Sequence, residues 1–206
     1  WSSDVCSSDL QCEMCNAKFS SAHDKGKRSV TPYDDENFIE QLKPFIPYLA
    51  ETKFLGGEPF LSDIYPKICK LIIELNPKCK IRIQSNGTVL NEKIESILQH
   101  GNFQIGLSID TLNPKRYEKI RNGAKIENTL KNLDFFKHIC QKNGENVSIS
   151  ACPMKENRFD IPELVKFCNS NDISIYFNNV VTQNFTLSEL SEEELDELIK
   201  YYKNNS

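Results

Sequence analysis

The sequence predicts an α/β protein: a partial (β/α)6 barrel of the TIM type, with parallel strands inside and helices outside. Two observations predict this fold. Short apolar strand patterns alternate with helical patterns through most of the 206 residues, which is typical of a parallel sheet covered by helices. Five strand patterns follow an opening cysteine loop and a sixth is implied before it, so an open barrel fits better than a closed one of eight units.

The expected elements follow one another along the chain. Strands are expected at residues 52–55, 80–84, 103–109, 147–152 and 173–177. Helices are expected at residues 34–49, 61–75, 91–98, 117–120, 126–139, 161–168 and 191–202. Pro44 and Pro47 interrupt the first helix because proline lacks the helical N–H. Asn91 is a favourable N-cap, and Ser191 with Glu194 has the spacing of a capping box.

Composition excludes several classes of protein. The length suits one domain with a real core, and the apolar and charged contents are those of a soluble globular protein. The net charge of −4 gives no electrostatic case for a nucleic-acid partner. No apolar run is long enough to span a bilayer, and no secretory signal is recognisable. We therefore expect a cytoplasmic protein with neither a nucleic-acid nor a membrane partner.

Three of the eight cysteines lie close together in the sequence, at Cys6, Cys12 and Cys15. Two thiols three positions apart can hold one corner of a metal or iron–sulfur centre without any long-range folding. In a reducing compartment such a cluster indicates metal binding or catalysis rather than a disulfide framework. The other five fall in helix or strand patterns and are expected to be buried structural thiols: Cys69, Cys79, Cys140, Cys152 and Cys168.

Polar and glycine-rich residues follow the predicted strands at their carboxyl ends. These segments are the Gly-Gly-Glu-Pro loop at 56–59, the turn at 85–87, the strand end at 108–110 and residues 152–153. Active sites of barrels are built from the loops at this end of the strands. The sequence therefore predicts that these loops share one site.

Two other chemistries for the cysteine pair can be compared with the sequence. A zinc module would need a second pair of thiols or histidines at matching spacing, and the sequence has none. A thioredoxin-like redox site would place the two cysteines at the start of a helix directly after a strand. Residues 16–31 instead have the polar character of a long loop.

Four segments together carry a resemblance to a known family. They are residues 12–16 with the two thiols, 54–61 with the diglycine, 107–110 and 117–124. Each is a weak signal alone, but in this order and spacing the chain resembles the radical S-adenosylmethionine (SAM) enzymes. The resemblance is greatest to the branch with SPASM or twitch C-terminal extensions.

The resemblance implies both cofactors and a reaction. A [4Fe–4S] cluster would be held by thiolates that include Cys12 and Cys15, and SAM would bind its open iron. One electron would cleave SAM to a 5′-deoxyadenosyl radical, which abstracts hydrogen from a substrate. The family branch leans towards a peptide or protein substrate, and the electron would come from a donor such as flavodoxin or ferredoxin. No catalytic residue beyond the cluster ligands is assigned.

The resemblance also implies a set of residues that bind SAM. They are Met14, Gly56, Gly57, Glu58, Pro59, Asn86, Ser108, Asp110 and Arg121. The glycines let the backbone approach the SAM amine closely, because neither has a Cβ. The negative charge of Glu58 would face the same amine, and Arg121 would pair with the SAM carboxylate.

Most of these positions also have an ordinary structural interpretation. A diglycine after a strand is a common turn, and Ser108 can be polar filler at a strand end. Asp110 could contact the SAM ribose or cap the following helix. Arg121 could lie on the surface, and Met14 could fill the core instead of packing on adenine. Asn86 and Gly87 could simply form the turn after their strand.

The first ten residues depart from the family pattern. The family's first cluster cysteine would fall at Ser8, and Cys6 lies two residues too early. With that thiol missing, we expect the chain as written to bind its cluster poorly or not at all, and to be inactive for that reason. Residues 1–10 resemble the in-frame translation of a sequencing adapter, so we expect natural sequence from residue 11. Residues 11–180 would then form the radical SAM core, and residues 181–206 would begin a helical C-terminal extension of a longer enzyme. The alternative is a truncated or non-catalytic relative that acts as a binding module.

Overall fold

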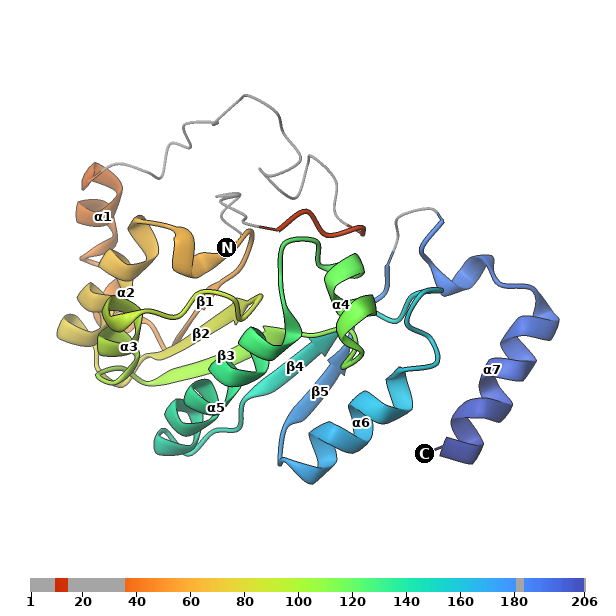
Figure 1. Ribbon diagram of the computed structural model, residues 1–206. Helices are drawn as coiled ribbons and strands as arrows, with labels where there is room; N and C mark the ends of the chain where they lie inside the picture. Colours follow the sequence, from red (N-terminus) through yellow and green to blue (C-terminus); the bar gives the residue numbers. More distant parts are fainter. Residues whose placement is uncertain (1–9, 15–35, 181–183, 206) are drawn as a thin grey trace.

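The computed structural model describes residues 10–14, 36–180 and 184–205 (Figure 1). Within these ranges, five strands form one parallel sheet in chain order. The strands are β1 (Glu51–Phe54), β2 (Lys80–Ser85), β3 (Phe103–Ser108), β4 (Ser148–Ala151) and β5 (Ser174–Phe177). The predicted α/β class and parallel sheet are confirmed. The sixth strand expected before the cysteine loop lies outside the described residues.

The helices lie close to where the sequence predicts them. The α-helices are α1 (Glu36–Leu42), α2 (Ile64–Leu75), α3 (Glu92–Leu98), α4 (Pro114–Ile120), α5 (Ile126–Lys142), α6 (Ile161–Ser170) and α7 (Glu192–Asn205). Short 3-10 helices occur at η2 (Ile46–Tyr48), η3 (Pro59–Leu61) and η4 (Leu187–Glu189). The prolines divide the first predicted helix into α1 and η2, as expected.

Local hydrogen bonds explain the helix starts. The Ile94 amide donates to the Asn91 side chain at 3.1 Å, which confirms the N-cap of α3. Ser191 and Glu194 exchange bonds of 2.9 and 3.2 Å, which confirms the capping box of α7. The helix predicted from residue 61 begins at Ile64 instead, because residues 59–61 close a 3-10 turn of their own.

The two faces of the sheet differ in chemistry. Sequential parallel strands joined by right-handed crossovers place their connecting helices on one face. On β2, Ile81 and Ile83 point to that helical layer and are 1% and 4% exposed. Arg82 and Gln84, which alternate with them along the strand, are only partly buried. The expectation of simply apolar strands is therefore incomplete, since the inner face of this open barrel is polar.

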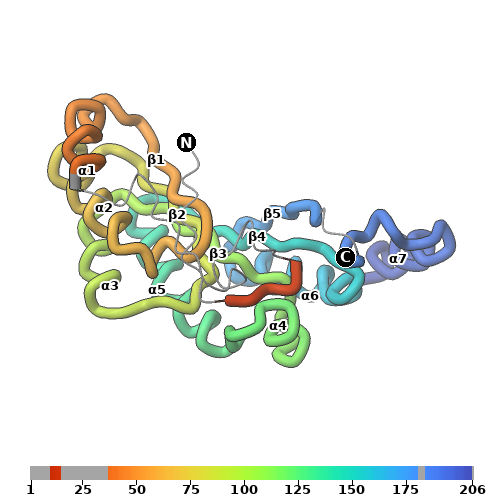
Figure 2. Tube along the Cα trace, turned by 90° about the horizontal axis from the view of Figure 1, so that it is seen from above, coloured from red at the N-terminus to blue at the C-terminus, as the bar shows by residue number. Residues whose placement is uncertain are grey.

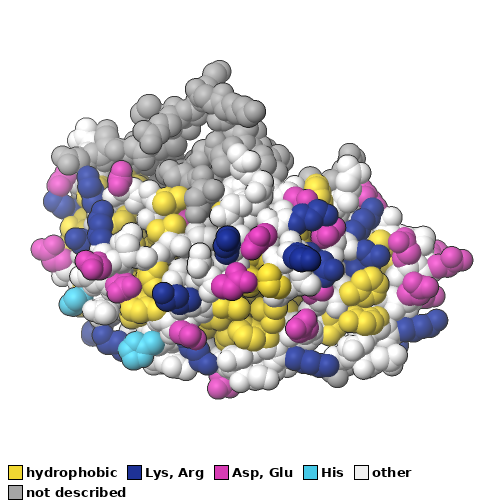
Figure 3. Space-filling model, in the orientation of Figure 1, with side chains coloured by type: hydrophobic (Ala, Val, Ile, Leu, Met, Phe, Trp, Pro, Cys, Tyr) yellow, Lys and Arg dark blue, Asp and Glu magenta, His cyan; other side chains and the backbone are white. Residues whose placement is uncertain are grey.

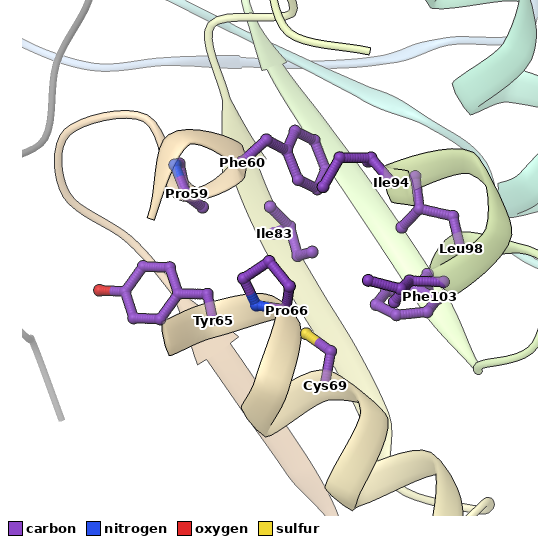
Figure 4. A pocket seen from close by; sticks show the side chains of 10 residues that line it. Pro59, Phe60, Tyr65, Pro66, Cys69, Ile83, Ile94, Leu98 and Phe103 are labelled. Carbon is purple, nitrogen blue, oxygen red and sulfur yellow. The ribbon is translucent and has the colours of Figure 1, made fainter. Parts of the chain in front are cut away.

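The helical layer packs tightly against the sheet. Figure 4 shows a small gap between η3, α2 and α3, lined by residues such as Phe60, Tyr65 and Phe103. Its cavity volume is about 10 Å³, which is close to the smallest space that holds one water molecule. The lining is apolar, so this gap is a packing defect in the core rather than a ligand site.

The C-terminal helix packs beside α6 at the β5 side of the molecule (Figure 1). The hydroxyls of Tyr201 and Tyr202 donate to the carbonyls of Phe159 and Arg158, at 3.1 and 2.8 Å. Acidic and basic side chains are interspersed over the face seen in Figure 3. Among the described helices, none combines the length and apolarity needed to cross a membrane.

Four of the five cysteines expected in the core are buried: Cys69, Cys79, Cys140 and Cys168. Cys152 is only half-buried. Burial raises the pKa of Cys140 and of Cys168 to about 11. Since the thiolate is the reactive form, these thiols should be inert in the folded protein.

We predict that iodoacetamide at pH 8 leaves Cys140 and Cys168 unmodified in the folded chain. At that pH only about one thiol in a thousand with this pKa is ionised, and access is blocked as well. Peptide mapping by mass spectrometry measures the labelling, and the same chain in urea is the control. Labelling of the folded chain at the rate seen in urea would contradict the buried positions.

Candidate cofactor site

A left-handed diglycine bend follows β1. Gly56 has φ of 89° and Gly57 has φ of 53°, a region that L side chains rarely adopt. The chain then extends through Glu58, and Pro59 begins η3. The bend lies directly after the carboxyl end of a strand, where the sequence predicts a SAM-binding loop.

Glu58 fastens this bend to the end of β2. Its carboxylate is 1% exposed. One oxygen accepts from the Phe60 amide at 3.1 Å and from the Ser85 hydroxyl at 2.9 Å. The other accepts from the Asn86 amide at 2.7 Å. The predicted role of Glu58 towards the SAM amine therefore has to coexist with three bonds inside the protein, and those bonds set the position of the bend.

The segment after β2 forms a turn, as its structural interpretation predicts. The Asn86 side chain accepts from the Thr88 amide at 2.9 Å and from its hydroxyl at 2.6 Å. Gly87 has φ of 77°, and a Cβ there would lie 2.9 Å from a methyl of Thr129. Glycine is therefore required for both backbone and space. The turn holds Asn86 beside Glu58 at the same edge of the sheet.

Asp110 and Arg121 form a buried ion pair at the carboxyl end of β3. Arg121 Nη2 lies 2.8 Å from Asp110 Oδ2, and the side chains are 8% and 0% exposed. The contact joins the charges without completing a hydrogen bond, because Oδ2 and Arg121 Nε each lack a hydrogen-bond partner among the described residues. Arg121 is thus not a surface residue, and Asp110 does not cap α4, since Asn113 fills that position.

Further bonds hold Asp110 in place. Its other oxygen accepts from the Cys152 amide at 2.8 Å, which ties the end of β3 to the end of β4. The fully buried Asn157 donates to the Asp110 carbonyl at 2.8 Å and to the Cys152 carbonyl at 3.0 Å. Sequence reasoning missed Asn157, because a single asparagine in a loop has no pattern that marks it.

The segment that carries Cys12 lies along the end of α4. The Gln11 amide donates to the Asn122 carbonyl at 3.0 Å, and the Glu13 amide donates to the Ile120 carbonyl at 2.9 Å. Figure 2 shows residues 10–14 beside α4 from above. Cys12 is 7% exposed. These bonds place residues 11–13, which include Cys12, beside Arg121.

Cys12 interacts electrostatically with Arg121 of the Asp110–Arg121 ion pair. Burial acts to lower the pKa of Arg121, but the neighbouring acidic groups, Asp110 first and Cys12 next, raise it above its ordinary value. The guanidinium is therefore a fixed positive charge at this edge. Met14 packs partly buried against a small cluster that contains Ile120 and Met154. Cys15, the second predicted ligand, lies outside the described residues.

Ser108 faces the inner side of the sheet. Its hydroxyl accepts from the Gln84 side chain at 2.9 Å. Beyond it, the polar face encloses a cavity of about 320 Å³. Ten residues line this cavity: Lys53, Leu55, Arg82, Ile83, Gln84, Gln104, Gly106, Ser148, Ser150 and Tyr176. Apart from Leu55, none of these residues belongs to a recognisable motif, and the alternation of apolar and polar residues at 80–84 is the signal in the sequence that points to a polar face.

The described residues can be compared with the needs of each cofactor. Gly56 and Gly57 leave the backbone bare where a SAM amine would approach, and Arg121 offers a buried N–H without an acceptor among the described residues. These features fit SAM. For the cluster, Cys12 is the one predicted ligand that is described, and the described residues contain no group of three metal-binding side chains.

This arrangement defines an α/β protein of the open-barrel class, with a candidate cofactor site at the carboxyl ends of its strands. The chain belongs to the Radical SAM superfamily, which it matches over residues 2–168. Enzymes of this family use a [4Fe–4S] cluster and SAM, so these are the cofactors of the family to which the chain belongs.

Individual relatives are distant. The GTP 3′,8-cyclase of Aliarcobacter butzleri is 23% identical over 171 residues, which are 80% of this chain and 52% of the relative. Streptococcus suis SuiB bound to the precursor peptide SuiA is 24% identical, with a TM-score of 0.66 over 99% of this chain and 44% of that one. Native anSMEcpe with bound AdoMet is 18% identical, with a TM-score of 0.70 over 98% and 58%. The chain spans about half the length of the curated relatives it matches.

We predict that Glu58→Gln lowers the free energy of unfolding by roughly 1–3 kcal/mol. The new amide nitrogen would face an N–H or O–H donor in place of an accepting oxygen. The matched control is Glu74→Gln, on the exposed surface of α2, which should change stability by less than about 0.5 kcal/mol. Urea unfolding measures both variants, and equal stability would count against the Glu58 bonds.

We predict that Asp110→Asn lowers the free energy of unfolding by about 3–5 kcal/mol, because it leaves the buried Arg121 charge without its partner. Asp134→Asn, exposed on α5, is the control for loss of a carboxylate. Adding Arg121→Met to Asp110→Asn should recover part of the loss, with a coupling energy above about 1 kcal/mol in a double-mutant cycle. Additive effects would show that the two charges do not interact.

Proposed function

We propose that this chain is the core of an enzyme that cleaves SAM reductively and uses the product to abstract hydrogen from a substrate. When bound, the cluster supplies one electron and SAM supplies the 5′-deoxyadenosyl radical. The observation that carries the proposal is the pairing of residues 11–13 with the end of α4. It brings the cysteine loop to the edge that also holds the Asp110–Arg121 pair.

The residues at this edge have complementary tasks in the proposed site. Cys12 and Cys15 are the cluster thiolates. The bare backbone of Gly56 and Gly57 receives the SAM amine, and Glu58 with Pro59 fixes the bend that presents it.

The remaining proposed residues hold the other parts of SAM. Arg121 pairs with the SAM carboxylate through the N–H that its contact with Asp110 leaves open. Asn86, after β2, and Ser108, at the end of β3, contact SAM from these two strand ends. Met14 packs on the adenine. Asp110 is fully buried, so its role in the proposed site is to hold the Arg121 side chain in position rather than to contact SAM.

The substrate that we propose is a peptide or protein, modified by an enzyme of the SPASM or twitch branch in the cytoplasm. Support comes from the likeness in fold to SuiB bound to its precursor peptide, which shares 24% identity with this chain. The open polar face of the sheet offers space for a substrate group beside the cofactor edge. A flavodoxin or ferredoxin is the proposed electron donor.

Anaerobic reconstitution with iron and sulfide, followed by dithionite and SAM, tests the proposal. We expect 5′-deoxyadenosine and methionine, detected by liquid chromatography with mass spectrometry, in low yield because the chain has Ser8 where the family has its first cluster cysteine. Cys12→Ala should lose cluster iron and product together, whereas Cys69→Ala, a buried thiol on α2, should keep both.

The third cluster ligand can be tested in the same assay. Ser8→Cys creates the family's three-cysteine spacing and should raise cluster iron and 5′-deoxyadenosine above those of the unchanged chain. If Ser8→Cys binds a cluster and SAM but releases no 5′-deoxyadenosine, the chain is a non-catalytic binding relative and the proposed function is wrong.

A further inference from the structure

The cavity on the inner face of the sheet has an uneven charge. Two of its ten lining residues are cationic, Lys53 and Arg82, and none is acidic. Its volume of about 320 Å³ suits a small ligand or one functional group of a larger molecule. None of the residues proposed for the cluster or for SAM is among those that line it. The cavity is therefore available to a second molecule.

The two cations lie side by side on neighbouring strands. Lys53 of β1 is in register with Arg82 of β2, which is in register with Gln104 of β3. Side chains directly opposite each other in a sheet are close enough to act on one group. Arg82 is in register with Gln104, which lies four residues before Ser108 at the strand end, so the cations sit about 13 Å from that edge along the strands.

The side chains of Lys53, Arg82 and Gln104, which lie in register on neighbouring strands, still have polar atoms available for a ligand. Arg82 pairs through Nε with Glu51 at 2.8 Å, which leaves the two terminal nitrogens of its guanidinium outside that contact. Among the described residues, the exposed Lys53 has no ion-pair partner. Gln104 Oε1 is buried without a donor, and as an acceptor it would meet an N–H or O–H of a ligand rather than its anionic group. A buried polar atom without a partner is uncommon in native proteins and points to a ligand.

Gly106 keeps this row accessible. A Cβ at that position would lie 2.3 Å from the side-chain oxygen of Gln84. The glycine lets Gln84 lie flat across β3 towards Ser108 instead of standing into the cavity. The space above Arg82 and Gln104 therefore stays open.

We propose that Lys53 and Arg82 bind an oxyanionic group of the substrate, a carboxylate or a phosphate, on the inner face of the sheet. Guanidinium and ammonium groups form strong charge-assisted bonds with such groups. Lys53 is exposed and the Arg82 side chain is 38% exposed, so the anchored group would sit on the open inner face of the sheet. The rest of the substrate would extend along the strands to the cofactor edge. This inference rests on the proposed function, because it assigns the cavity to the substrate of that reaction.

Isothermal titration of the full chain with two probes tests the site at low ionic strength. Inorganic tripolyphosphate represents phosphates, and glutarate represents carboxylates. We expect at least one probe to bind, and Lys53→Gln and Arg82→Gln each to weaken it by roughly tenfold. Lys70→Gln, on the exposed face of α2, removes the same charge outside the cavity and should leave binding within about twofold.

A substitution that is expected to increase affinity distinguishes a direct effect on binding from an effect of misfolding. Glu51→Gln removes the carboxylate that competes for Arg82 and should tighten probe binding by about threefold. A destabilised variant would not gain affinity. The inference is overturned if neither probe binds, if Lys70→Gln weakens binding as much as Lys53→Gln, or if Glu51→Gln weakens it.

The probe titrations, compared with the 5′-deoxyadenosine assay of the reconstituted chain, distinguish this inference from the proposed function. If the chain cleaves SAM while neither probe depends on Lys53 and Arg82, the anion site is wrong and the proposed function stands. If a probe depends on both cations while the reconstituted Ser8→Cys chain binds a cluster and SAM but releases no 5′-deoxyadenosine, the anion site stands and the proposed function is wrong. The probe that binds more tightly assigns the group as phosphate or carboxylate.

Discussion

The buried contact between Asp110 and Arg121 is the interaction on which the arrangement of the site depends. Asp110 follows β3, Arg121 ends α4, and residues 11–13 bond to the backbone on either side of Arg121. Removing two charges from water costs several kcal/mol for each ion, and an apolar pair of similar volume would often be at least as stable. The value of the pair is therefore positional, because it fixes the end of α4 and sets a positive charge beside Cys12.

Glu58 likewise fixes the position of the neighbouring loop, but through hydrogen bonds instead of an ion pair. Its carboxylate takes hydrogen bonds from Phe60, Ser85 and Asn86, so the diglycine bend after β1 and the turn after β2 move as one unit. Two buried acidic groups thus connect the ends of four strands in two pairs, β1 with β2 and β3 with β4. In both cases the charge is satisfied chiefly inside the protein, and each carboxylate positions a neighbouring group that we propose binds SAM: the diglycine backbone in one case and the Arg121 guanidinium in the other.

Much of the fold could be predicted from the sequence, because alternating strand and helix patterns are local. Asn91 and Ser191 mark helix starts through bonds that span three residues, and the prolines after α1 end it by their own covalent geometry. The loops after β1, β2 and β3 could also be assigned to one edge, since parallel strands all point the same way. The contacts of Asn157, and the burial of Arg121, could not be predicted, because their partners are distant in sequence.

The order of the elements, the strand-end loops and the cysteine motif can all be read from the chain, because each depends on neighbouring residues and their intrinsic preferences. Which groups these residues contact depends on the folded structure. It placed Cys12 over the end of α4, committed Asp110 to Arg121, and set Lys53 beside Arg82 across two strands. Those outcomes follow from strand register and crossover packing, which bring together groups that no local pattern connects.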